Sequence, residues 1–109
     1  MDQPDAVLVL TTWPAASDPA PCATTLVEER LAACVNLLPE MDSVYRWQGA
    51  VTRDRERQLV IKTSSGRLPA LRARLAELHP YEVPELLVLA VSGGGAAYLA
   101  WLAAATTPE

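Results

Sequence analysis

Apolar positions change their spacing several times along the chain, and each change indicates a new element. Residues 6–12 (AVLVLTT) form a continuous apolar run rich in β-branched residues, which is typical of a strand covered on both faces. A helix should begin near Asp18 and Pro19, because Asp18 can cap free amides and Pro19 suits the first turn. Apolar residues then recur at three- and four-residue steps as far as Cys34, so we expect a helix that buries Cys34.

In the middle of the chain the spacing changes to alternation. Residues 43–48 and 57–63 alternate apolar and polar side chains, with Gly49 between them, which predicts a β-hairpin. The stretch 53–57 (RDRER) alternates in charge and is expected to form the solvated tip. The arm 36–48 would be about 43 Å long, whereas a compact chain of this size is roughly 34 Å across. The far half of the hairpin should be exposed unless another chain covers it, which predicts self-association.

The second half of the chain predicts a helix, a strand and a final helix. Leucines at helical spacing follow Pro69, and Pro80 ends that helix. Residues 85–91 form an apolar strand, and residues 96–106 form the last helix after a run of three glycines. The complete order is that of a ferredoxin-like split βαβ sandwich, an α+β fold with a long β-hairpin and an added C-terminal helix. We expect residues 1–109 to be one such domain.

Composition narrows the classes of function. The chain has 109 residues, half of them apolar, which is enough for a core without disulfides. Its net charge is −4 and it has no basic stripe, so nucleic acid is not an expected partner. No apolar run approaches the roughly 18 residues that span a bilayer, and the first ten residues carry acids where a signal peptide carries basic residues. We therefore expect a cytoplasmic protein without a membrane partner.

Several segments together resemble one known family. The order and spacing of five motifs are similar to those of the CutA divalent-cation-tolerance family: ERLAACVNLLP (29–39), SVYRWQG (43–49), IKT (61–63), HPYEVPE (79–85) and AYLAWL (97–102). The resemblance implies a cytoplasmic homotrimer of ferredoxin-like subunits, PII-like in architecture, whose long hairpins wrap neighbouring subunits. It also implies a non-enzymatic scaffold or sensor in the response to divalent metals, including copper.

His79, the single histidine, is the candidate metal ligand. Copper and zinc sites need converging imidazole or thiolate ligands, and the chain has no Cys-x-x-Cys motif and no second histidine. On one helix, Cys22 and Cys34 would lie about 18 Å apart along the axis and could not share an ion. Copper-binding proposals for the resembled family use a cysteine and further histidines where this chain has Thr11 and Leu78. We expect no required cofactor and only weak binding of copper or another divalent cation.

The segment 79–85 has other interpretations. It could be a rigid turn, because Pro80 stops the helix and the Tyr81 ring anchors the chain. For catalysis, His79 could be a general base oriented by Glu82, but no nucleophile is evident, so we do not expect an enzyme.

A small-ligand site is the alternative function, since PII-like trimers bind ligands in clefts between subunits. The candidate residues combine cations for an anionic metabolite, rings for stacking and a carboxylate for a donor: Arg46, Trp47, Lys62, Tyr81 and Glu82. The same residues could equally form salt bridges and packing at a subunit interface.

Overall fold

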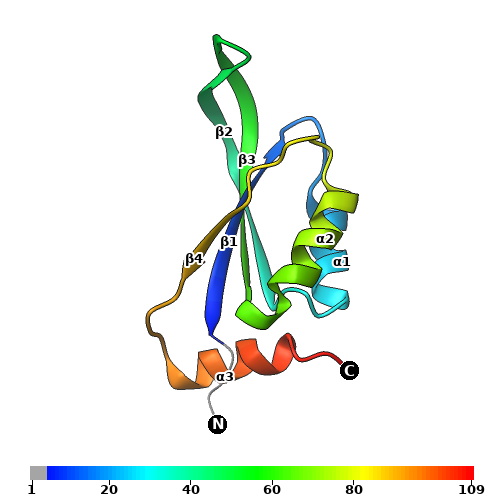
Figure 1. Cartoon of the computed structure of the whole chain (residues 1–109), viewed down its shortest axis with the longest axis vertical. Coiled ribbons are helices and arrows are strands. Elements are labelled where there is room, and N and C mark those ends of the chain that lie inside the picture. Colours follow the sequence, from blue (N-terminus) through cyan, green and yellow to red (C-terminus); the bar gives the residue numbers. More distant parts are fainter. Residues whose placement is uncertain (1–4) are drawn as a thin grey trace.

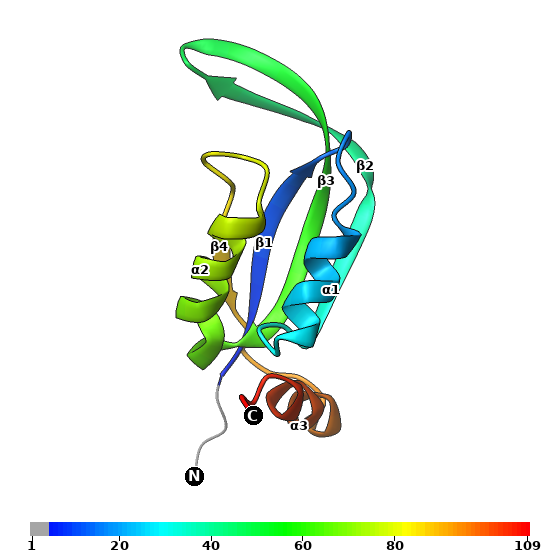
Figure 2. The same ribbon diagram turned by 90° about the vertical axis from the view of Figure 1, so that its right-hand side faces the viewer.

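The structure is a computed structural model that describes residues 5–109. The elements are β1 (Ala6–Pro14), α1 (Ala20–Glu28), β2 (Cys34–Trp47), β3 (Ala50–Ser64), a short 3₁₀ turn (Ser65–Arg67), α2 (Leu68–Leu78), β4 (Leu87–Ala90) and α3 (Ala96–Ala105). The four strands form one antiparallel sheet in the order β2-β3-β1-β4. Helices α1 and α2 lie together on one face of this sheet, and α3 crosses its lower end (Figures 1 and 2). The predicted ferredoxin-like arrangement is confirmed.

The core lies between the sheet and the helix pair. Alternate residues of β1 point toward the helices and are buried, as the period of two in a strand requires. The cluster is filled by aliphatic side chains from both layers, among them Val9, Leu26, Leu59, Ile61 and Leu71, all with 0% exposure.

Among the described residues, no helix pair covers the opposite face of the sheet (Figure 2). Leu8 and Leu10 of β1 are only partly buried there, and their register partners on β4 are Leu89 and Leu87. These two β4 leucines are 45% and 54% exposed, respectively. A row of leucines on an open sheet face is a surface that another chain can cover.

The first helix ends earlier than its apolar spacing predicts. Arg30 has a φ of 60°, a left-handed conformation that stops α1, and the Leu31 amide bonds back to the Leu26 carbonyl. The chain then turns, and Cys34 begins β2. The prediction that Cys34 lies on the buried stripe of this helix is therefore wrong. Leu31 lies beyond the end of α1 but still packs in the core. Its apolar character therefore looks, in the sequence, like one more turn of the helix.

The hairpin also turns at a different place. Trp47 pairs with Ala50, so the tip is the two-residue turn Gln48–Gly49, whose φ angles are 49° and 81°. Positive φ at both positions is the mark of a type I′ turn, which fits the twist of a hairpin. The charged stretch 53–57 lies within β3 instead, so its prediction as the tip is wrong.

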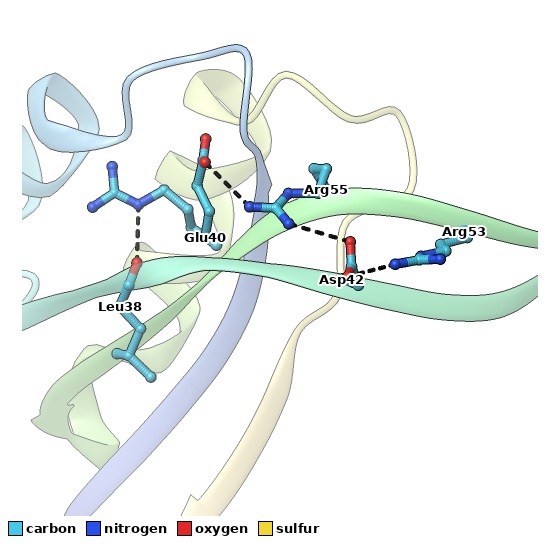
Figure 3. A network of polar contacts seen from close by, with 6 residues as sticks. Leu38, Glu40, Asp42, Arg53 and Arg55 are labelled. Carbon is cyan, nitrogen blue, oxygen red and sulfur yellow. Dashed lines mark hydrogen bonds and ion pairs between the residues drawn. The ribbon is translucent and has the colours of Figure 1, made fainter.

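The charges of that stretch pair across the hairpin (Figure 3). Arg53 bonds Asp42 at 2.8 Å, and Arg55 reaches Glu40 at 3.4 Å and Asp42 at 3.5 Å. Two arginines of the alternating stretch on β3 therefore pair with acids on β2. From the sequence alone, the same alternation of charge suggests a solvated loop.

The hairpin projects beyond the rest of the molecule, as its length predicts (Figure 1). The longest extent of the chain is 49 Å, against 26 and 23 Å in the other directions. The β2–β3 register shifts between Leu37 and Glu40, and Arg57 donates to the Leu38 carbonyl at 2.9 Å. Pro39 lacks the amide that a regular ladder needs, which accounts for the irregularity. Beyond it the hairpin bends over the loop between α2 and β4 (Figure 2). Within residues 5–109 no helix is long and apolar enough to cross a membrane.

Candidate functional site

His79 joins the end of α2 to the end of β1. Its side chain is 8% exposed, and its ring centroid lies 4.6 Å from that of Trp13 and 5.2 Å from that of Tyr81. The Tyr81 amide donates to Nδ1 at 3.0 Å, and Nε2 lies 2.8 Å from the Thr12 carbonyl and 3.1 Å from the Thr11 hydroxyl. Because Nδ1 accepts a hydrogen bond, the network assigns the proton to Nε2, which donates to Thr12. Both ring nitrogens are thus used by hydrogen bonds within the chain.

The surroundings of His79 favour its neutral form. Burial lowers its pKa from the ordinary value of 6.5, and the Thr12 carbonyl and the Glu56 carboxylate act more weakly in the opposite direction. The ring could ligate a metal only by releasing one of its two hydrogen bonds. The rigid-turn interpretation of this segment matches these contacts.

A cleft of about 630 Å³ lies between the bent part of the hairpin and the turn that follows His79. The hairpin contributes Tyr45, Trp47 and Glu56, among others, and the turn contributes Tyr81 and Glu82. The volume falls in the range of small-molecule sites, which are typically lined by aromatic side chains with a few polar groups.

Glu56 and Tyr81 form the polar centre of the cleft. The Tyr81 hydroxyl donates to the Glu56 carboxylate at 2.6 Å, and Glu56 is only 7% exposed. Burial and the neighbouring carboxylate both raise the pKa of Tyr81, so its hydroxyl stays protonated and remains a donor.

Three further hydrogen bonds fix the walls of the cleft. Gln58 donates to the Thr11 carbonyl at 2.8 Å and to Glu85 at 3.0 Å. The Tyr45 hydroxyl donates to Asp54, which raises the pKa of Tyr45.

The structure brings together three of the five predicted ligand-binding residues. Trp47, Tyr81 and Glu82 line the cleft, whereas the two cations do not. Arg46 bonds the Gly49 carbonyl at the hairpin tip at 3.5 Å. Lys62 lies on β3 far along the sheet, with its ammonium 6.0 Å from the ring centre of Tyr98 on α3. Within one chain, the predicted anion site is therefore not assembled.

The cysteines also lie apart from the cleft. Cys22 is buried on α1, where burial raises the pKa of its thiol, and Cys34 is partly buried at the start of β2. In residues 5–109, no three His, Cys, Asp or Glu side chains are grouped closely enough to hold a metal ion.

Sequence reading missed Glu56, the most buried carboxylate of the cleft. Its place in the RDRER stretch suggested solvent exposure, and only tertiary contact with Tyr81 buries it. A partial signal was available, because Pro39 predicts a break in the facing strand and hence a bend in the hairpin.

Comparisons with known proteins all match one family, and the matches cover nearly the whole chain. The sequence profile of the family described as CutA1 divalent ion tolerance protein matches residues 7–105. The divalent-cation tolerance protein CutA of Thermus thermophilus is 47% identical over 95 residues, which are 87% of this chain and 92% of that protein. The CutA protein of Pectobacterium atrosepticum is 47% identical over 98 residues, 90% of this chain and 89% of that protein. The solved structure of the divalent cation tolerance protein (Cut A1) from Thermus thermophilus superposes with a TM-score of 0.89 at 45% identity, covering 94% of this chain and 99% of that one.

Proposed function

This chain belongs to the CutA1 divalent ion tolerance protein family, and from that premise we propose that it acts in divalent-cation tolerance as a homotrimeric, non-enzymatic scaffold or sensor. The observation that carries the assembly is the uncovered sheet face, with Leu87 and Leu89 exposed beside the half-buried leucines of β1. The projecting hairpin adds exposed apolar area at its far end, including Val51 at 68% exposure. Apolar patches of this kind mark protein interfaces. The number three comes from the resemblance to the family.

The aromatic pair on α3 supports the same proposal. Tyr98 and Trp101 are each 48% exposed and lie 5.3 Å apart between ring centroids. Aromatic side chains exposed in this way are enriched at interfaces, where burial of their rings stabilises association.

Light scattering after size exclusion tests the assembly. We expect a mass three times the 11.8 kDa of the protomer at micromolar concentration. Leu87→Asp places a charge on the open sheet face and should reduce the mass to that of a monomer. Ala73→Asp adds the same charge at an exposed position of α2 and should leave the trimer intact. A monomeric wild type, or equal dissociation of both variants, would refute the proposed interface.

The tolerance role needs a separate test in cells. A host that lacks its own family member is grown in graded copper and complemented with wild type, Leu87→Asp or Ala73→Asp. We expect wild type and Ala73→Asp to restore growth and the interface variant to fail. If Leu87→Asp restored growth as well as wild type, tolerance would not require the assembly, and the proposed role of the trimer would be contradicted.

For the metal itself we propose weak contact without a chelating site. The support is the single histidine with both nitrogens engaged and the lack of a three-ligand group in residues 5–109. Calorimetric titration of copper into wild type and into His79→Ala tests His79 as a ligand. A binding event that disappears in the variant supports His79 as a ligand, and identical titrations would show that His79 is not a ligand.

The anion-binding alternative would require two subunits. Arg46 and Lys62 are separated within one chain, so a cleft that uses them must take them from different copies. A thermal-shift screen of nucleotides and organic anions, with Lys62→Ala as the control, tests this. Stabilisation by an anion that Lys62→Ala abolishes would favour the alternative.

We also propose a cytoplasmic location. Its support is that Cys22 and Cys34 are both free thiols, which suits a reducing compartment. Fractionation of cells that express the tagged chain tests it, and recovery in an oxidising compartment would contradict it.

A further inference from the structure

The carboxylate of Glu56 is buried without a cation. Glu56 is 7% exposed and lines the cleft, and in residues 5–109 its side chain has one hydrogen bond, from Tyr81, and no ion pair. Burial of a charge is costly unless a partner of opposite sign or several donors compensate it. One neutral donor at one oxygen offsets this cost only in part. The carboxylate therefore lacks a positively charged partner, which a ligand could supply.

The other charged residues that line the cleft also favour a positively charged ligand. Glu82 and Glu85 line it together with Glu56, and no lysine or arginine does so among the described residues. The nearby arginines of the hairpin are engaged elsewhere, since Arg53 and Arg55 reach the acids of β2 (Figure 3). An anion would meet carboxylates here without a compensating charge.

The walls add aromatic surface. Tyr45, Trp47 and Tyr81 come from the hairpin and the turn and line the same cleft. The negative face of an aromatic ring attracts a cation positioned over it, and Trp and Tyr do so more strongly than Phe. Buried carboxylate and ring surface together are the chemistry that recognises amines and guanidines.

A bare metal ion fits less well. The carboxylates do not form a group of three that could share one ion, and a volume of about 630 Å³ is far larger than a single ion needs. From these observations we propose that this cleft binds an organic cation with N–H donors, a primary ammonium or a guanidinium. Its charged group bonds Glu56, and its carbon chain lies against the aromatic walls. The inference does not rest on the metal-tolerance proposal.

Agmatine is a suitable probe, because it carries a guanidinium and a primary ammonium on a short alkyl chain. The assembled protein is titrated with agmatine, choline and succinate by isothermal calorimetry, with tryptophan fluorescence as a second readout. We expect saturable agmatine binding, weaker binding of choline because it has no N–H donor, and none of succinate.

Matched variants locate the site. Glu56→Gln keeps the shape of the side chain and its bond from Tyr81 but removes the charge, and should weaken agmatine binding by about tenfold or more. Glu28→Gln removes an equal charge from an exposed position of α1 and should bind as wild type. Trp47→Leu removes an aromatic wall without touching a charge and should also weaken binding, which keeps the test valid if Glu56→Gln fails to fold.

Three results would overturn the inference. Agmatine could fail to bind at millimolar concentration, or bind equally to wild type, Glu56→Gln and Trp47→Leu, or bind no better than succinate. A crystal structure of the assembly with a lysine or arginine of a second copy bonded to Glu56 would overturn it as well, since the cleft would then be an interface.

Discussion

Replacement of His79 gives a direct measure of how much the turn after α2 depends on one neutral ring. In His79→Ala, the Thr12 carbonyl loses a donor at 2.8 Å and the Tyr81 amide loses an acceptor at 3.0 Å. A fully buried group left without a partner costs about 1–3 kcal/mol, and these two groups are partly buried, so the loss should lie in the lower half of about 2–6 kcal/mol. A domain of this size has about 5–15 kcal/mol of stability in total, so the variant should be visibly weakened.

The effect should also depend on pH. Burial lowers the pKa of His79 below 6.5, so the unfolded chain takes up a proton at a higher pH than the folded chain. Between the two pKa values the unfolded state binds more protons, and stability falls as the pH falls, by at most about 1.4 kcal/mol per pH unit. The contribution of His79 is therefore complete above its unfolded pKa and declines below it.

Urea denaturation followed by circular dichroism measures this at a fixed protomer concentration. The difference in unfolding free energy between wild type and His79→Ala should be largest at pH 8 and smaller at pH 5.5. His79→Gln provides the control, because its amide can still donate to Thr12 but cannot titrate. A difference that is constant from pH 8 to pH 5.5, or that grows on acidification, would refute the neutral buried ring.

Three further predictions concern the hairpin and the cleft. Tyr81→Phe removes the one donor that the described residues offer the buried Glu56 carboxylate, and should lower the unfolding free energy by about 1–3 kcal/mol in urea; an unchanged midpoint would mean that water replaces the hydroxyl. Gly49→Ala places a side chain at a φ of 81° in the turn and should cost roughly 1–2 kcal/mol, seen as a lower melting temperature, whereas an equal or higher one would contradict the turn geometry. Arg55→Ala should change stability by less than about 1 kcal/mol, because its two ion pairs are exposed, and a larger loss would indicate burial by a neighbouring chain.

The fold was largely predictable because its elements have clear periods. Apolar runs, alternation and three- to four-residue spacing each correspond to one kind of element, and Pro19, Pro69 and Pro80 mark helix boundaries. The end of α1 was not predictable, because Arg30 adopts its left-handed conformation without a glycine to signal it.

The cleft was predictable only in part. Trp47, Tyr81 and Glu82 could be named because aromatic and charged residues stand out in the sequence. Glu56 could not, because its burial depends on a bend of the hairpin that brings residues 25 apart into contact. Strand alternation identifies which residues share a face, but it does not indicate how a projecting hairpin folds back.

Tyr81 connects His79 to the cleft, so the stability of the turn, ligand binding and the copper titration of His79→Ala are not independent. His79 does not line the cleft, yet its Nδ1 accepts from the Tyr81 amide, and the Tyr81 hydroxyl holds Glu56. Loss of His79 should therefore loosen the cleft without removing any group that touches a ligand. It follows that copper binding lost in His79→Ala identifies a ligand only if Tyr81→Phe, which disturbs the cleft but keeps the imidazole, still binds copper. If both variants lose it, the metal depends on the cleft, and His79 acts by positioning Tyr81.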